Sequence, residues 1–275
     1  MDILAATKYL LNIHNLRPQK SKSQHFLISE KVYKEIVKAA EVGKEDVVLE
    51  IGPGLGFLTT RLLEQAQRVI AIEIDEKLFV VLEKLKLLYP NLELIRQDVL
   101  KFDELSLPAK YKIVANIPYH LTGQIIRKFL SSQNPPQTMV LLVQKEVAER
   151  ICAKPGSHSL LSLAVQYYGK PAIIRQVKRT QFYPPPKVDS VILKISDIKP
   201  PTDKFLDKKF WQIVRIGFSS KRKTLAHNLS AGLRVDKGQV KQMLAAVGLP
   251  EKIRAEDLSI EQWQALARSV ADKGW

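Results

Sequence analysis

The stretch Val47 to Thr59, VVLEIGPGLGFLT, decides the fold of this chain. Its first half is a compact run of apolar, mostly β-branched residues, which is typical of a buried strand in a parallel sheet. Three glycines follow within five positions: Gly52, Gly54 and Gly56. Because glycine adopts positive φ at little cost and lets a backbone approach a ligand closely, they indicate a ligand-cradling turn. We expect a strand over residues 47–51, then this turn, then a helix over 57–65.

The turn alone leaves its ligand open. The dinucleotide fingerprint G-x-G-x-x-G would need a glycine where the chain has Phe57, so the match to NAD is imperfect. The pattern present, Glu50-x-Gly52-x-Gly54-x-Gly56, is similar to the first motif of Rossmann-like methyltransferases that use S-adenosylmethionine. A tight strand-to-helix turn without any ligand is the alternative.

Strand-like and helix-like patterns alternate around this turn. Apolar runs predict four more strands, over residues 69–74, 92–95, 113–117 and 139–143. Helical patterns lie before and between the strands, over residues 30–40, 76–88 and 122–130. Alternating units of this length predict a parallel sheet with helices on both faces.

Two later strand patterns, 172–178 and 188–195, have no helical stretch between them. We therefore expect them to pair antiparallel at one edge of the sheet, because antiparallel neighbours need no crossover helix. The predicted fold class is α/β, with a mostly parallel sheet and an antiparallel edge pair.

The clearest linker is the stretch Ser196 to Thr202, SDIKPPT. Beyond it no strand pattern occurs, and short helices are expected over residues 210–218, 237–247 and 260–270. We predict two domains: residues 1–198 carry the sheet, and residues 199–275 form a small all-helical domain.

The charge of the chain points to a polyanionic partner. Its formal net charge is +15, which favours nucleic acid over a membrane surface. A basic protein without such a partner is the alternative. From residue 199 onward there are 15 Lys and Arg against 8 Asp and Glu, so the predicted helical domain is about twice as basic per residue as the rest.

Cysteine use and hydropathy indicate an intracellular protein. Cys152 is the only cysteine, so the chain has no disulfide framework and no cysteine-built metal site. No apolar run approaches the ~18 residues of a membrane span. The first sixteen residues resemble an amphipathic helix rather than a cleaved leader, and we expect a cytoplasmic protein. The five histidines share no metal-ligand spacing, and no metal site is assigned.

Polar side chains stand where three successive strands end, which is where ligands bind in a doubly wound sheet. Glu73 lies 21 residues after Gly52, the spacing at which a carboxylate can accept both hydroxyls of a ribose. Asp98 follows the next strand and can accept from the exocyclic amine of an adenine. Exposed carboxylates or a helix cap are the competing uses. Together the strand ends outline a ligand that contains adenosine.

The fourth strand ends in Asn116-Ile117-Pro118-Tyr119. The N6 amine of adenine is a poor nucleophile, because its lone pair is delocalised into the ring. An Asn oxygen and a backbone carbonyl beside a proline can each accept one N6 hydrogen, which turns the lone pair towards a methyl donor. Tyr119 can stack on the base and hold it out of its helix. Positioning and electrostatics can then supply most of the catalysis without a general base.

Over essentially its full length the chain resembles the small-subunit ribosomal RNA adenine N6,N6-dimethyltransferases, which are Rossmann-like, class I S-adenosylmethionine methyltransferases. The matching blocks are Ser23 to Leu27 (SQHFL), the glycine turn, Ile72 to Asp75 (IEID), Asp98 to Leu100 (DVL), Asn116 to Tyr119 (NIPY), Phe182 to Ser190 (FYPPPKVDS) and Phe218 to Leu225 (FSSKRKTL). The family usually has Gly at 23 and Asn at 25, and a small residue at 57.

The resemblance implies roles for individual residues. S-adenosylmethionine would be the cofactor, and the residues expected to bind it are His25, Leu27, Gly52, Gly54, Glu73, Asp98 and Asn116. Asn116 would also hold the target amine, Tyr119 would stack on the base, and Phe182 would form the second face of the base sandwich. The implied substrate is a pair of adjacent adenosines near the 3′ end of 16S rRNA in the immature small subunit, each methylated twice. The chain is expected to be monomeric when free.

Basic residues form three clusters, at 17–22, 175–179 and 221–223. A solvated surface is the default interpretation for each of them. Lys221, Arg222 and Lys223 lie in the basic C-terminal region and are the best candidates for RNA phosphate contacts, which position a protein without reading sequence.

Three other functions compete with this interpretation. The large-subunit 23S adenine dimethyltransferases that confer macrolide resistance share the cofactor motifs and the fourth-strand tetrapeptide. A non-catalytic ribosome assembly or transcription factor could retain the same fold. A DNA adenine methyltransferase is disfavoured by Ile117, where such enzymes usually have proline.

Overall fold

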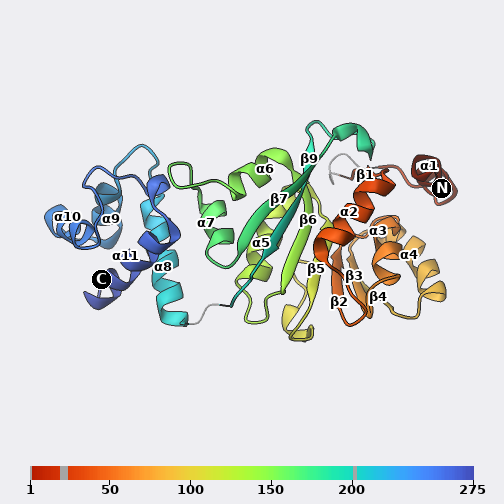
Figure 1. The fold of residues 1–275 in the computed structure, drawn as a ribbon, viewed down its shortest axis with the longest axis horizontal. Helices are drawn as coiled ribbons and strands as arrows, with labels where there is room; N and C mark the ends of the chain where they lie inside the picture. The colour runs from red at the N-terminus through yellow and green to blue at the C-terminus, as the bar shows by residue number, and fades with distance from the viewer. Residues whose placement is uncertain (1, 19–23, 201–202) are drawn as a thin grey trace. The chain divides into compact units, whose positions relative to one another are not determined.

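The computed structural model describes residues 2–18, 24–200 and 203–275. These residues form two compact units (Figure 1). Unit 1 comprises described residues within 2–148 and 169–200, and unit 2 comprises residues 149–168 and 203–275. Within the described ranges, no helix is both long and apolar enough to cross a membrane.

Unit 1 is built on a seven-stranded sheet with the strand order β4-β3-β2-β5-β6-β9-β7. The strands are β2 (Val47–Ile51), β3 (Arg68–Glu73), β4 (Leu92–Arg96), β5 (Lys112–Asn116), β6 (Thr138–Gln144), β7 (Lys170–Val177) and β9 (Ser190–Ser196). The first five are parallel to one another, and β9 runs antiparallel to both β6 and β7. The predicted α/β class, the parallel sheet and its antiparallel edge pair are therefore confirmed.

Helices cover both faces of this sheet. On one face lie α2 (Glu30–Ala40), α3 (Phe57–Leu63) and α4 (Glu76–Leu88), and α5 (Thr122–Leu130) lies behind β6 and β7 in the view of Figure 1. Strand order reverses direction at β2, so right-handed crossovers place the helices that follow β2 and β3 opposite the helix that follows β5. The predicted bounds of α4 and α5 agree with the structure to the residue.

The N-terminal segment adds a second, very small sheet. Helix α1 (Ile3–Ile13) begins at Asp2, whose side chain accepts from the amides of Leu4 and Ala5. Strand β1 (Phe26–Leu27) then pairs antiparallel with β8 (Phe182–Tyr183), which lies between β7 and β9 in the chain. The sequence did not predict this pairing, because two-residue strands carry no measurable alternation.

Unit 2 is entirely helical. It contains α7 (Leu160–Gln166), α8 (Lys204–Gly217), α9 (Leu225–Leu233), α10 (Lys237–Ala246) and α11 (Ile260–Asp272), and α6 (Lys145–Ile151) runs into it from unit 1. Its core contains the fully buried Trp263. The ring of Tyr167 also stacks on Phe210, with centroids 3.9 Å apart.

The predicted domain of residues 1–198 differs from unit 1 in residues 149–168. This segment carries α7, whose Leu163 is buried in the core of unit 2. The hydroxyl of Tyr168 donates to Asp207 on α8, at 3.1 Å. Chain order alone assigned α7 to the larger domain, because no sequence pattern indicates which part of the chain this helix packs against.

The glycine turn is tightly packed at its third glycine. Gly56 has φ +83°, and a Cβ atom there would lie 2.4 Å from Cδ1 of Leu85 on α4. Gly52 also has positive φ, +66°, but its nearest neighbour would be Cδ of Pro118, at 3.8 Å. A side chain at Gly52 would therefore cause backbone strain alone, whereas one at Gly56 would cause both backbone strain and a steric clash.

We expect Gly56→Ala to lower the free energy of unfolding by about 2–4 kcal/mol, because strain and overpacking add. Gly52→Ala, the matched control, should lose only the strain, about 1 kcal/mol. Urea denaturation followed by circular dichroism measures both values. Equal losses would show that Leu85 gives way without cost.

Candidate active site

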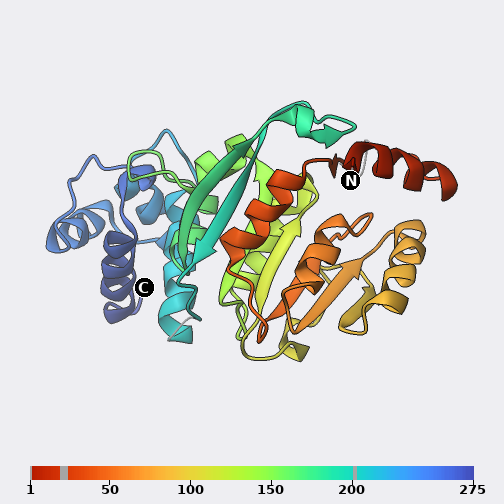
Figure 2. The ribbon, with the colours of Figure 1, turned by 45° about the vertical axis from the view of Figure 1, so that its right-hand side comes forward.

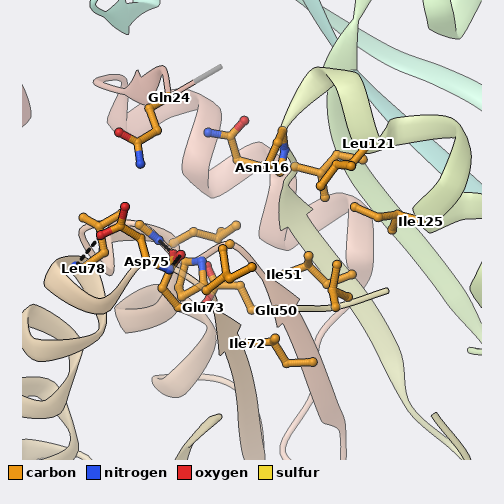
Figure 3. Close-up of a pocket in the computed structure, with 18 of the residues that line it drawn as sticks. Gln24, Glu50, Ile51, Ile72, Glu73, Asp75, Leu78, Asn116, Leu121 and Ile125 are labelled. Carbon is orange, nitrogen blue, oxygen red and sulfur yellow. Dashed lines mark hydrogen bonds between the residues drawn. The ribbon is translucent and has the colours of Figure 1, made fainter. Parts of the chain in front are cut away.

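A cavity of about 350 Å³ opens in unit 1 where β2, β3, β4 and β5 end. Figure 3 shows the side chains of Glu50, Glu73, Asp75 and Asn116 converging on this space from different elements. Eight residues assigned to the site from sequence line the cavity: His25, Leu27, Gly52, Gly54, Glu73, Asp98, Asn116 and Tyr119. Parallel pairing brings together those that follow β2, β3, β4 and β5, because it places all four strand ends at one edge of the sheet. The pairing of β1 with β8 holds the strand that carries Leu27 and follows His25.

Glu73 is held in place by the backbone around it. Its Oε2 accepts from the Gly54 amide at 3.3 Å, and its Oε1 accepts from the Asp75 amide at 2.9 Å. The side chain is buried, and this burial raises the pKa of its carboxyl group despite the two hydrogen bonds. Hydrogen bonds to Glu73 therefore join the glycine turn to the end of β3 on one side of the cavity.

Asp98 has the same kind of local anchor. Its Oδ1 accepts from the Leu100 amide at 2.9 Å, which is a short Asx turn rather than a helix cap. The side chain is half-buried and lines the cavity. One carboxylate oxygen is thus fixed, and the carboxylate keeps further acceptor capacity for a ligand amine.

Asn116 has an amide group of defined orientation. Its Nδ2 donates to the backbone carbonyl of His25 at 3.3 Å. Because a carbonyl can only accept, this contact fixes which end of the amide is the nitrogen. The Oδ1 atom is left as the acceptor at the end of β5, as the interpretation of the NIPY tetrapeptide requires.

Tyr119 lies beside His25 in the lining of the cavity. The two rings are nearly parallel, with an interplanar angle of 21° and centroids 5.9 Å apart. The Tyr119 hydroxyl and the Ser190 Oγ are 2.8 Å apart, and burial raises the pKa of the phenol. His25 Nδ1 donates to the Pro184 carbonyl at 2.7 Å. The imidazole is therefore held next to Tyr119.

Phe182 is not brought to the cavity. It lies on β8 opposite Leu27, its side chain is only 2% exposed, and it belongs to the apolar core of unit 1. Phe57, an unexpected residue after the glycines, lines the cavity and packs against Tyr33, with ring centroids 6.4 Å apart. A large side chain at position 57 is thus accommodated by an aromatic contact.

Glu50 is a polar residue of the cavity to which the sequence analysis gave no role. It is 1% exposed at the end of β2, and its Oε2 has no hydrogen-bond partner in the described part of the chain. Burial raises the pKa of this carboxyl group to about 8, with the nearby Glu73 acting in the same direction. The sequence signal that could have identified Glu50 is a glutamate within an otherwise apolar strand.

The basic clusters are only partly described. Residues 19–23, which include most of the first cluster and Ser23, lie outside the described residues. In the second cluster, Arg175 forms an ion pair with Glu35 of α2. Lys221, Arg222 and Lys223 are exposed in the turn that precedes α9, where Thr224 caps the helix. None of these three forms an ion pair with another described residue.

Comparison with known proteins agrees with this geometry. Residues 15–272 match the family model described as ribosomal RNA adenine dimethylase. A ribosomal RNA small subunit methyltransferase A from Dehalococcoides mccartyi is 40% identical and covers 98% of this chain and 94% of its own length. A protein of the same name from Moorella thermoacetica is 39% identical, over 98% of this chain and 99% of its own length.

Two solved structures are similar over most of the chain. A dimethyladenosine transferase from Plasmodium falciparum has a TM-score of 0.78 and 32% identity, covering 91% of this chain and 98% of its own. The 23S rRNA methyltransferase ErmE has a TM-score of 0.73 and 27% identity, over 90% of this chain and 99% of its own. The nearly complete coverage of each protein includes the sheet and the helical region.

The buried acid at position 50 makes stability depend on pH. The folded-state pKa of Glu50, about 8, lies above its ordinary value of 4.5, so the unfolded chain loses this proton first as pH rises. Between about pH 4.5 and pH 8, the ionisation of Glu50 alone should therefore lower the free energy of unfolding by about 1.4 kcal/mol per pH unit.

We expect Glu50→Gln to match the parent near pH 5 and to exceed it at pH 8 by on the order of 4 kcal/mol. Denaturant titrations across this pH range measure the difference. Glu45→Gln, at an exposed position, is the control and should show no such trend. A Glu50→Gln curve parallel to that of the parent would mean that Glu50 ionises freely in the folded protein.

Proposed function

The chain belongs to the ribosomal RNA adenine dimethylase family, and we propose that it dimethylates N6 of two adjacent adenosines in a hairpin loop near the 3′ end of 16S rRNA. The methyl groups would come from S-adenosylmethionine during maturation of the small ribosomal subunit. The names of its relatives, which refer to the small subunit, support this choice of substrate. We further propose that the protein acts in the cytoplasm and is monomeric when free.

The observation that carries this proposal is the oriented amide of Asn116. Its Nδ2 is held by the His25 carbonyl, so Oδ1 is available to accept from an amine that enters the cavity. Tyr119 lines the same cavity and offers an aromatic ring for a base. An acceptor fixed in advance lowers the reorganisation needed when charge develops on the amine.

The residues of the cavity fit S-adenosylmethionine. Glu73 has the position and the acceptor oxygens for ribose hydroxyls, and Asp98 those for the adenine amine. Gly54 has φ +62°, a backbone conformation that residues with a side chain rarely adopt, so glycine suits a turn that passes beneath a ligand. His25, Leu27 and Gly52 would hold the methionine end. When bound, the cofactor supplies a methyl group already activated by its positively charged sulfur.

The chain's own residues would position the target adenine. Asn116 Oδ1 and the carbonyl of Ile117 would each accept an N6 hydrogen, and the proton released on methylation would pass to solvent. Tyr119 would stack on the base. For a base to stack between Tyr119 and His25, the two ring planes would have to be about 7 Å apart, which is twice an ordinary carbon contact. The ring centroids are now 5.9 Å apart, so the two rings would have to separate. Phe182 remains the proposed second face, and it can take that role only if the segment around β8 moves.

The helical domain is proposed to contact the rRNA through Lys221, Arg222 and Lys223. They are exposed and form no ion pair with any residue that the structure describes, which leaves their charges available for phosphates. Such contacts would add affinity and orientation, while the adenosines are recognised in the cavity.

One rival is supported by a specific observation. The similarity to ErmE extends over 90% of this chain, so methylation of 23S rRNA is a second candidate. The identity to ErmE is 27%, whereas the small-subunit relatives reach 41%. A non-catalytic assembly factor is less well supported, because Glu73, Asp98, Asn116 and Tyr119 all line one cavity.

Mapping the modified nucleotide tests the function directly. Labelled S-adenosylmethionine is incubated with the protein and with under-methylated small subunits, 23S rRNA or large subunits. We expect N6,N6-dimethyladenosine at two adjacent positions near the 3′ end of 16S rRNA. Transfer only to 23S rRNA would select the rival.

Asn116→Ala should keep the fold and reduce transfer by about 10²–10³-fold, the usual cost of removing one preorganised polar contact to the reacting group. Single-turnover assays with saturating cofactor and RNA measure this loss, and calorimetry reports cofactor binding separately. Asn116→Gln serves as a second variant, because it keeps the amide but displaces it. A rate for Asn116→Ala within a few fold of the parent would remove Asn116 from its assigned role.

A further inference from the structure

The segment that connects β7 to β9 borders the cavity on the side of Tyr119. The Ile28 amide donates to the Gln181 carbonyl at 2.8 Å, and β1 pairs with β8. His25 then bonds to Pro184, and Tyr119 bonds to Ser190 at the start of β9. These contacts tie both halves of the segment to residues that line the cavity.

This segment is basic. Residues 178–189 contain Lys178, Arg179 and Lys187 and a single acid, Asp189. All three side chains are exposed, and none forms an ion pair with another described residue. Arg175, only three residues earlier, is paired with Glu35. Three cations therefore have no ion pair with a described residue, although Arg179 is close enough to Asp189 to interact with it electrostatically, in a segment that is bonded to the lining of the cavity.

The three cations are held near one another by the backbone. The Arg179 amide donates to Asp189 Oδ1 at 2.9 Å, which brings the stretch that follows Lys187 back to the start of the segment. A fourth cation joins them from α1, because Lys8 Nζ lies 5.6 Å from the centroid of the Tyr183 ring. Figure 2 shows this part of the chain beside α1. We call Lys8, Lys178, Arg179 and Lys187 the basic rim.

We propose that the basic rim binds the RNA phosphates that flank the target adenosine. This inference rests on the proposed function and names a surface of unit 1 for RNA, separate from the cluster at residues 221–223. A base that leaves its stack to enter the cavity brings its own backbone to the cavity mouth. Lysine and arginine without acidic partners are the side chains that bind such phosphates, and the binding energy helps offset the cost of unstacking.

A charged surface with no ligand is the competing explanation, and position argues against it. On α4 the exposed lysines alternate with Glu76 and Glu83, as on an ordinary solvated helix. The segment of the basic rim carries only one acid, Asp189, against three cations, and it is bonded to the cavity through Pro184 and Ser190. Positive charge therefore predominates in a segment that is bonded to the lining of the proposed adenine site.

The test compares two triple variants. In the rim variant, Lys178→Gln, Arg179→Gln and Lys187→Gln remove three charges and keep similar side-chain lengths. In the control, Lys38→Gln, Lys86→Gln and Lys110→Gln remove three equally exposed charges elsewhere in unit 1. Fluorescence anisotropy with a labelled RNA hairpin that has two adjacent adenosines in its loop gives the Kd over a series of salt concentrations.

We expect the rim variant to bind this hairpin about tenfold more weakly or worse at low salt, with a salt slope smaller by about 2, or 0.7 per lost contact. Its KM for RNA should rise while kcat stays within a few fold, and its cofactor Kd and melting temperature should be unchanged. The control should match the parent in all of these. An unchanged salt slope in the rim variant, or an equal change in the control, would overturn the inference.

The inference and the function can fail separately. If the parent protein transfers no methyl group to 16S rRNA, the proposed function fails, whatever the binding curves show. If the parent is active and the rim variant binds RNA as the control does, the function stands and the basic rim is only a solvated surface.

Discussion

The site depends on the parallel pairing of β2 with β3 on one side and β5 on the other. Val48 is the partner of Val69 in one neighbour and of Lys112 in the other, so the three strands end at the same edge. A slip of one residue would turn every side chain of a strand to the opposite face. The hydrogen bond from the Gly52 amide to Ile72, at 2.9 Å, extends this register into the glycine turn. Glu73 and Asn116 are brought to one cavity by backbone pairing rather than by contact with each other.

Much of this arrangement could be predicted from the sequence, because long apolar runs and glycine spacing are local signals. The glycine turn, the helices α4 and α5 and the antiparallel edge pair were predicted correctly. The β1–β8 pair was not, because its two-residue strands are 155 residues apart in sequence and only tertiary packing selects them. The place of α7 in unit 2 also depends on contacts with a distant part of the chain.

The sequence says least about site residues whose role depends on how deeply their side chains are buried. The motif that carries Phe182 resembles the family pattern, yet nothing in the spacing of its residues reveals that the ring faces the core. Glu50 stood in the quoted glycine motif, but its lack of a partner depends on the residues around it. Local patterns predicted which residues reach the strand ends, and three-dimensional packing determines which of their atoms remain available.

The availability of Asn116 Oδ1 has a consequence for the end of the reaction. Free adenosine has two N6 hydrogens, the monomethylated base has one, and the dimethylated base has none. On the proposed function, each transfer removes one hydrogen bond from the contact with Asn116 and the neighbouring carbonyl. The finished nucleotide therefore leaves both acceptors unsatisfied, and an acceptor buried without a donor is unfavourable. The number of hydrogen bonds to the base thus falls with each methyl group added, and the fully methylated product is bound less tightly than the substrate.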